Sequence, residues 1–222
     1  MIEWLSNLVA PLNAVLFTMG SDVVTWAELL GFVTGAACVA LTVANRIENF
    51  PVGIANSLFF LVLFASARLW ADSGLQVVYV VLGFVGWWQW LYGGARHASL
   101  EVRPATRNQL LGCVVWVVVG TVGLMLLLRR ADDAAPFWDA LTTSLSLAAQ
   151  YLLSSRRVQT WWFWIAADVV YVPLYLSRDL DLTGIVYILF LGLAVAGYLQ
   201  WRRTARADRM PAAPPAVGTV AS

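Results

Sequence analysis

Long apolar stretches separated by short polar segments occupy the chain from residue 23 to residue 201. A helix needs roughly 20 predominantly apolar residues to cross the hydrocarbon core of a bilayer. The pattern predicts seven such helices, and turn-forming pairs such as Asn45-Arg46 and Gly93-Gly94 mark their ends. We place them at about 25–44, 51–67, 73–92, 109–128, 137–154, 160–177 and 182–201. The predicted fold class is an all-α integral membrane protein.

The two ends of the chain differ from this pattern. Residues 1–22 suggest an interfacial segment anchored by Trp4 and Phe17. They are not a convincing secretory signal, because Glu3 stands where basic residues would be expected. Residues 204–222 are rich in Ala and Pro and predict a disordered cytoplasmic tail.

Composition supports the membrane assignment. Hydrophobic residues make up 60% of the chain and charged residues only 12%, whereas soluble domains carry about 25% charged residues. The net charge of +1 and the absence of a basic run with interleaved aromatics argue against nucleic acid as a partner. Cys38 and Cys113 lie inside predicted helices without metal-ligand spacing, so we expect buried thiols and neither metal nor cofactor.

Two parts of the sequence recur at an offset of 111. Residues 46–50 (Arg-Ile-Glu-Asn-Phe) match 157–161 (Arg-Val-Gln-Thr-Trp), and 86–90 match 197–201. We therefore predict triple-helix repeats at 23–93 and 131–203, joined by a loop and a linker helix over 94–130. One extra span gives both repeats the same orientation, a 3+1+3 arrangement with parallel repeats. Chance similarity between Trp-rich helix ends is the alternative.

Arginine placement predicts the orientation, because cytoplasmic loops are enriched in basic residues. With the C-terminus inside, ten arginines lie on the inner side and four on the outer side. We expect an outside N-terminus and an inside C-terminus. The inner set is Arg46, Arg96, Arg103, Arg107, Arg156, Arg157, Arg202, Arg203, Arg206 and Arg209, and the outer set is Arg68, Arg129, Arg130 and Arg178.

The predicted helix over 160–177 carries a polar stripe. Trp161, Trp164, Asp168, Tyr171 and Tyr175 share one face. A carboxylate deep in a membrane helix costs about 2.5–3.5 kcal/mol on insertion scales and usually faces a bundle interior or an aqueous path. Asp168 therefore either handles a substrate or ion, or is protonated or bonded to a neighbouring helix. Aromatic rings beside a carboxylate suit a flat cationic ring.

Other predicted helices carry uncharged polar positions that, taken together, suggest a cavity able to hydrogen-bond a ribose or an amide. Taken singly, each such side chain more often bonds a neighbouring helix. Tryptophans near helix ends are equally ambiguous, since interfacial anchors and ligands both occur there. This applies to Trp90, Trp161, Trp162 and Trp201.

Several motifs together resemble those of the Pnu vitamin transporters, most closely the members that carry nicotinamide riboside. The resemblance covers about residues 23–203. It implies a 3+1+3 fold like that of a full-length SWEET transporter, facilitated diffusion across a bacterial inner membrane, and trapping of the substrate by a cytoplasmic kinase. It also favours a homo-oligomer. The motifs are 75–79 (Leu-Gln-Val-Val-Tyr), 86–90 (Gly-Trp-Trp-Gln-Trp), Trp161 to Trp164, 173–175 (Pro-Leu-Tyr) and 197–201 (Gly-Tyr-Leu-Gln-Trp).

The family's binding residues come from the central halves of five helices. Members often carry Asn near the position of Asp168, so the Asp is either a departure from the family or a trait of a subgroup, and it would favour a cationic cargo. Nicotinamide riboside and thiamine are cationic, riboflavin is not, and deoxynucleosides are a further possibility. Carried over to this chain, the resemblance suggests a substrate site of Asn56, Gln76, Tyr79, Trp87, Gln150, Trp164, Asp168, Tyr175 and Tyr187.

Two other functional classes fit less well. An intramembrane enzyme would need a second ionisable or nucleophilic group near Asp168, and the only histidine, His97, lies in a predicted polar loop. We therefore expect no catalytic residues. A receptor or scaffold would not need a polar cavity lined by both repeats. A proton-coupled porter using Asp168 remains an alternative to facilitated diffusion.

Overall fold

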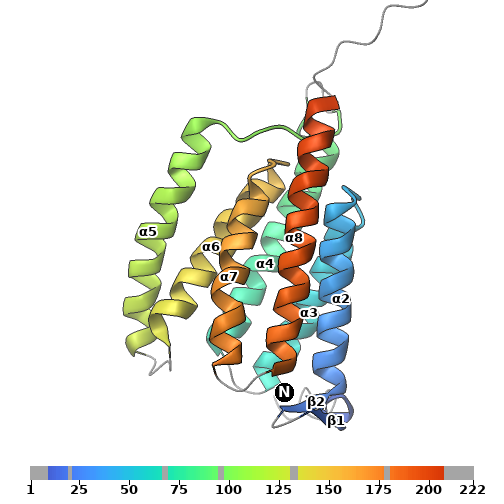
Figure 1. The fold of residues 1–222 in the computed structure, drawn as a ribbon, viewed down its shortest axis with the longest axis vertical. Helices are drawn as coiled ribbons and strands as arrows, with labels where there is room; N and C mark the ends of the chain where they lie inside the picture. The colour runs from blue at the N-terminus through green and yellow to red at the C-terminus, as the bar shows by residue number, and fades with distance from the viewer. Residues whose placement is uncertain are drawn as a thin grey trace, which may run out of the picture.

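The computed structural model describes residues 10–19, 22–66, 70–94, 98–130, 135–177 and 181–207. Within these ranges the chain forms seven α-helices, in agreement with the prediction (Figure 1). Their bounds are α2 Trp26–Val43, α3 Asn49–Ser66, α4 Trp70–Tyr92, α5 Arg107–Arg130, α6 Pro136–Ser154, α7 Thr160–Leu176 and α8 Asp181–Ala207.

Five of these helices, among the residues described, are long and apolar enough to cross a membrane: α2, α3, α4, α5 and α8. Large apolar side chains also point outward, as Val118, Val119 and Trp88 do with about 60% or more of their surface exposed. Such a surface suits lipid rather than water. The chain is therefore a multi-pass membrane protein.

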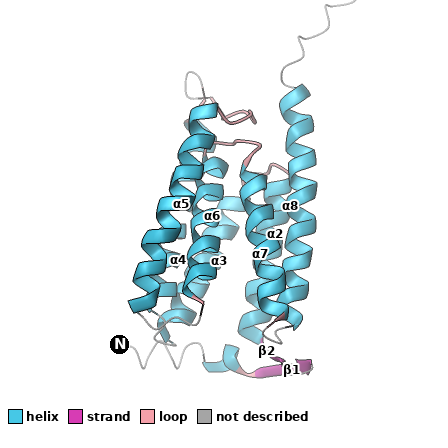
Figure 2. Ribbon diagram, turned by 60° about the vertical axis from the view of Figure 1, so that its left-hand side comes forward, coloured by secondary structure: helices cyan, strands magenta, loops and turns pink. Residues whose placement is uncertain are grey.

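The helices form two neighbouring groups. Along the chain, α2 packs on α3 and α3 on α4, while α6 packs on α7 and α7 on α8. Contacts of α2 with α8 and of α4 with α6 join the groups, and α5 lies at the edge, packed mainly on α6 (Figures 1 and 2). The Trp116 indole of α5 donates to the Ser144 carbonyl of α6 at 3.2 Å.

Three connections, α2–α3, α4–α5 and α6–α7, meet at the same end of the bundle as the C-terminal end of α8 (Figure 1). Asn45 and Arg156, 111 positions apart, both have positive φ, 60° and 53°. The Arg156 Nε donates to Asn45 Oδ1 at 3.0 Å, and its guanidinium lies 4.4 Å from the centre of the Trp90 ring. Equivalent turns of the two groups are thus joined directly.

Buried tryptophans form the core just below these turns. The Trp90 indole donates to the Leu153 carbonyl and the Trp201 indole to the Thr42 carbonyl, each at 2.9 Å. The two donors, Trp90 and Trp201, are 111 positions apart, and so are the two acceptors, Thr42 and Leu153. Each group of helices therefore makes the equivalent hydrogen bond to the other group. The Trp90 and Trp201 rings lie 5.7 Å apart. These two and Trp161 are buried, which excludes them as interfacial anchors, whereas Trp162 is exposed.

Two parts of the chain differ from the sequence prediction. Helix α8 continues to Ala207, so residues 204–207, assigned to the disordered tail, are helical; the buried Ala205 packs in the same core cluster as Val102 and Trp201. A 3-10 turn, Ala10–Asn13, and a hairpin of β1 Val15–Met19 and β2 Asp22–Thr25 precede α2. Thr25 and Glu28 then form a capping box at the start of α2.

Other predictions fall outside the part of the chain that the structure describes. These include Trp4, His97 and residues 208–222 of the predicted tail. Phe17, the other predicted anchor, is exposed on β1.

Glycines of α8 allow a matched test of helix packing. A Cβ on Gly197 would lie 2.4 Å from the Trp161 ring, whereas one on Gly192 would meet nothing within 4 Å. Gly197→Ala is therefore expected to lower the free energy of unfolding by about 1–3 kcal/mol through overpacking. Gly192→Ala should raise it by about 0.5–1 kcal/mol, because alanine loses less conformational entropy in a helix. Thermal unfolding in detergent measures both, and equal shifts would contradict the packing.

Candidate functional site

Asp168 lies on α7, about 12 Å along the helix from its start at Thr160. It is 6% exposed, and none of the residues described hydrogen-bonds or ion-pairs its carboxylate. A buried carboxylate without a donor is costly. The group is therefore available to a ligand that supplies positive charge or hydrogen bonds.

A cluster of three tyrosines stands beside Asp168. Tyr171 and Tyr175 follow it along α7, and their rings stack at 5.6 Å with an interplanar angle of 20°. Tyr187 of α8 lies 4.6 Å from the Tyr171 ring and 5.1 Å from the Tyr175 ring. Tyr187 is also close enough to Asp168 to interact with its charge. Two helices thus place a carboxylate beside flat aromatic surfaces.

Hydroxyl contacts extend this cluster to α4 and α6. Thr142 of α6 lies close enough to the Tyr171 hydroxyl to interact with it, and Ser146 of α6 lies likewise beside the hydroxyl of Tyr79 of α4. Tyr79 and Tyr171 interact electrostatically. Side chains from four helices, three of them in the second group, therefore converge near Asp168.

The remaining predicted site residues divide into two sets. Gln76 precedes Tyr79 by one turn and Gln150 follows Ser146 by one turn, and both are half-buried. Trp87 and Trp164 are partly buried against the tryptophan core. Trp164 lies one turn beyond Trp161, on the way to Asp168.

Asn56 does not join the cluster through its amide. Its Nδ2 donates to the Gly31 carbonyl at 3.1 Å and to Thr34 Oγ1 at 2.7 Å, which links α3 to α2. Asn56 therefore makes an interhelical contact, which is the alternative role that the sequence analysis gave for amide side chains in membrane helices.

Sequence reasoning left three residues of the cluster out of the predicted site. Tyr171 was already on the α7 stripe and could have been included for its spacing from Asp168. Ser146 was one of many weak polar positions. Thr142 is fully buried on α6, and only its contact with Tyr171 identifies it.

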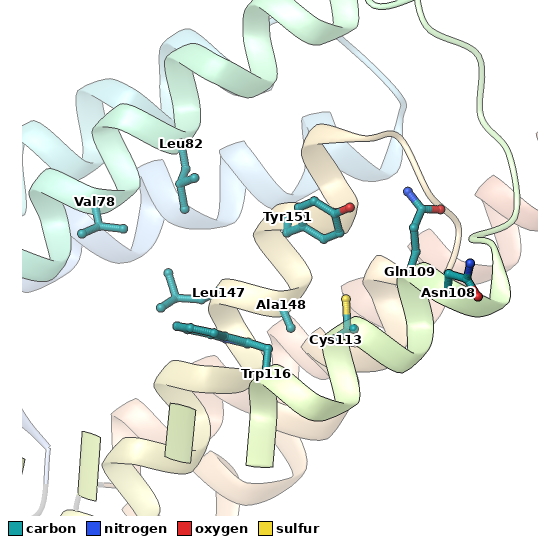
Figure 3. Close-up of a pocket in the computed structure, with 10 residues that line it drawn as sticks. Val78, Leu82, Asn108, Gln109, Cys113, Trp116, Leu147, Ala148 and Tyr151 are labelled. Carbon is teal, nitrogen blue, oxygen red and sulfur yellow. The ribbon is translucent and has the colours of Figure 1, made fainter. Parts of the chain in front are cut away.

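A separate groove of about 670 Å³ lies between α4, α5 and α6. Figure 3 shows Trp116, Leu147 and Tyr151 around it. None of the predicted site residues lines the groove, and its walls are largely apolar. A nucleoside would leave most of its hydrogen-bonding groups unpaired there, so the groove is a poor candidate for the substrate site.

Comparisons with known proteins bear on this arrangement. Residues 25–203 match the family model described as nicotinamide mononucleotide transporter. The chain is 26% identical over 208 residues to the nicotinamide riboside transporter PnuC of Escherichia coli (strain K12), covering 82% of this chain and 87% of the relative. It is 27% identical over 206 residues to the riboflavin/roseoflavin transporter RibM of Streptomyces davaonensis, covering 90% and 95%.

A solved structure has the same fold. It is described as the crystal structure of the vitamin B3 transporter PnuC, and it superposes with a TM-score of 0.67 at 22% identity, covering 93% of this chain and 90% of that one. The match of the family model extends over most of the chain, and the helices that it covers hold the buried carboxylate and tyrosines. The chain therefore belongs to the nicotinamide mononucleotide transporter family, the Pnu transporters, and is similar to PnuC.

Proposed function

We propose that this protein imports nicotinamide riboside by facilitated diffusion across a bacterial inner membrane, and that a cytoplasmic kinase then traps the substrate. The observation that carries the proposal is the buried Asp168, which has no hydrogen-bond or ion-pair partner among the described residues, beside the Tyr171, Tyr175 and Tyr187 rings. Nicotinamide riboside presents a flat pyridinium cation, which suits a carboxylate flanked by π-surfaces. Its ribose hydroxyls and amide suit the hydroxyls and amides of α4 and α6.

Riboflavin is the second candidate cargo, because RibM is about as similar to this chain as PnuC is. Its ring system is uncharged. A riboflavin bound here would leave the Asp168 carboxylate without a counter-charge, at a cost that a cationic cargo avoids. Thiamine, which is cationic, and deoxynucleosides remain further alternatives on the same fold.

The proposed transport path runs between two parallel triple-helix repeats, α2–α4 and α6–α8, with α5 as linker. Matching contacts 111 positions apart support this arrangement, notably the Trp90 and Trp201 bonds. The end that carries these tryptophans also carries Arg46, Arg156, Arg157 and most of the other arginines assigned to the inside. We therefore assign it to the cytoplasm, with the substrate site deeper in the bundle. Assembly as a homo-oligomer is part of the same proposal.

Ligand-induced stabilisation of the purified protein tests the cargo. A ligand that binds only the folded state adds about 2.7 kcal/mol of stability at 100 times its Kd. We expect nicotinamide riboside to raise Tm, and its uncharged dihydro form, nearly the same in shape, to raise it much less. Riboflavin, thiamine and a deoxynucleoside complete the panel. A larger shift with riboflavin would replace the proposed cargo.

Net uptake into proteoliposomes tests the mechanism separately from the cargo. Facilitated diffusion predicts uptake of labelled nicotinamide riboside that persists after an uncoupler has removed an imposed proton gradient. Uptake abolished by the uncoupler would establish proton coupling instead.

A further inference from the structure

A groove of about 190 Å³ lies at the end of the bundle where the α4–α5 and α6–α7 connections meet the last turns of α8. Pro104 and Val158 contribute from the connections, and Tyr198, Arg202 and Arg206 contribute from α8. Arg202 and Arg206 are one helical turn apart and both are exposed. The groove therefore presents two guanidinium groups beside an apolar wall.

The positive charge at this groove has little counter-charge in the part of the chain that the structure describes. The ion pairs there are Arg46 with Glu48 and Arg103 with Glu101. Neither Arg202 nor Arg206 belongs to one, and no acidic residue lines the groove. The two α8 guanidiniums are thus open to an external anion.

A third arginine, Arg157, adjoins the groove, because it precedes Val158 in the chain and bonds Pro104, and both of those residues line the groove. Arg157 donates to the carbonyl of Pro104 at 3.5 Å, but its Nε–H is buried without an acceptor among the residues described. The pKa of Arg157 lies below its ordinary value because of burial and, secondly, because of the positive charge of Arg103. A half-buried cationic group beside a like charge is stabilised when an anion approaches.

The residues around the groove are of the kinds that suit the depth of lipid headgroups. Tyr198 forms an aromatic pair with the exposed Trp162 at 6.3 Å, and such rings gather at the membrane–water interface. The small and apolar Val158 and Ala205 line the wall toward the bundle. A water-soluble anion would match the arginines but not this wall, whereas a phospholipid matches both.

We propose that the groove between Pro104, Val158 and α8 binds the phosphate headgroup of an anionic phospholipid, with Arg202 and Arg206 on the phosphate and the acyl chains toward Tyr198. Basic pockets on the cytoplasmic side of membrane proteins bind such lipids. The bound lipid ties α8 to the α4–α5 and α6–α7 connections. It thus stabilises the end of the bundle that holds Trp90 and Trp201.

Lipid titration of the full-length protein in neutral detergent tests the proposal. Native mass spectrometry and thermal unfolding are recorded with phosphatidylglycerol, phosphatidylcholine or glycerol 3-phosphate. We expect adducts and a raised Tm with phosphatidylglycerol only. The variant R202Q/R206Q is expected to weaken phosphatidylglycerol binding roughly 10- to 30-fold, from about 1 kcal/mol for each basic residue at an anionic surface.

The double variant R129Q/R130Q is the matched control, because it removes the same charge far from the groove. Arg129 and Arg130 lie in the last turn of α5, whereas the connection that borders the groove leads into the first turn of that helix. It should bind phosphatidylglycerol like the original protein. Equal binding by R202Q/R206Q and the original protein would overturn the proposal, as would equal binding of phosphatidylcholine. Binding of glycerol 3-phosphate as strong as that of phosphatidylglycerol would also overturn it and assign the groove to a soluble phosphate. Counterflow of nicotinamide riboside is a separate readout, so failure here leaves the transport proposal intact.

Discussion

Replacing Trp201 with alanine is expected to lower the free energy of unfolding by about 3–5 kcal/mol, the range for removing a large aromatic side chain from a packed core. The Trp201 ring is 0% exposed and contacts Trp90 and Trp161, with ring centres 5.7 and 5.6 Å away. Its indole also donates to the Thr42 carbonyl of α2. The alanine variant loses these ring contacts and leaves that carbonyl without its donor, so it is expected to reduce transport as well.

Thermal unfolding of purified variants measures this effect. Trp201→Phe keeps an aromatic ring but loses the N–H, so it should cost about 1–3 kcal/mol for the unsatisfied acceptor. Trp90→Ala should resemble Trp201→Ala, since Trp90 makes the equivalent bond to Leu153. Trp88→Ala is the control, because Trp88 is 60% exposed on α4. If Trp201→Ala were as stable as Trp88→Ala, the tryptophan core would not hold the two groups of helices together.

Asp168→Asn is expected to act in opposite directions on binding and on stability. Affinity for nicotinamide riboside should fall at least about 30-fold, since removing one partner of a buried charge pair costs about 2 kcal/mol or more. The ligand-free protein should be as stable or more stable, because the variant no longer buries a carboxylate that has no partner in the described part of the chain. A residue needed only for folding would lower both quantities together.

Isothermal titration and counterflow with labelled nicotinamide riboside measure the first effect, and thermal unfolding without ligand measures the second. Asp168→Glu keeps the charge and should recover part of the affinity. Asp181→Asn is the matched control, because Asp181 is exposed in the first turn of α8. Unchanged affinity in Asp168→Asn would remove Asp168 from the substrate site and with it the charge argument against riboflavin.

The helices could be predicted from the sequence because lipid imposes a simple rule on length and polarity. Each apolar stretch must satisfy its own backbone hydrogen bonds as a helix, so α2 to α7 begin and end within a few residues of the prediction. The hairpin before α2 and the last turns of α8 lie outside this rule. Residues 204–207 are helical, and Ala205 belongs to the same core cluster as Val102, in a segment about a hundred positions earlier in the chain.

The candidate site was only partly predictable for a related reason. Helical spacing alone places Asp168, Tyr171 and Tyr175 on one face of α7. Spacing says nothing about which neighbouring helix meets that face. The approach of Tyr187 and of Thr142 to Tyr171 therefore depends on packing. Asn56 shows the same limit, because an amide that bonds Gly31 and Thr34 has the same local pattern as one that binds a ligand.

The sequence by itself determined the membrane class, the helix positions, the 111-residue offset and the family, since these follow from local polarity, spacing and motif. Only the tertiary structure decided the roles of Trp90, Trp161 and Trp201. An indole near a helix end has the same sequence pattern whether it faces headgroups or a core. The difference lies in what each ring meets, and the bonds to Leu153 and Thr42 join residues 63 and 159 positions apart, which no local pattern encodes.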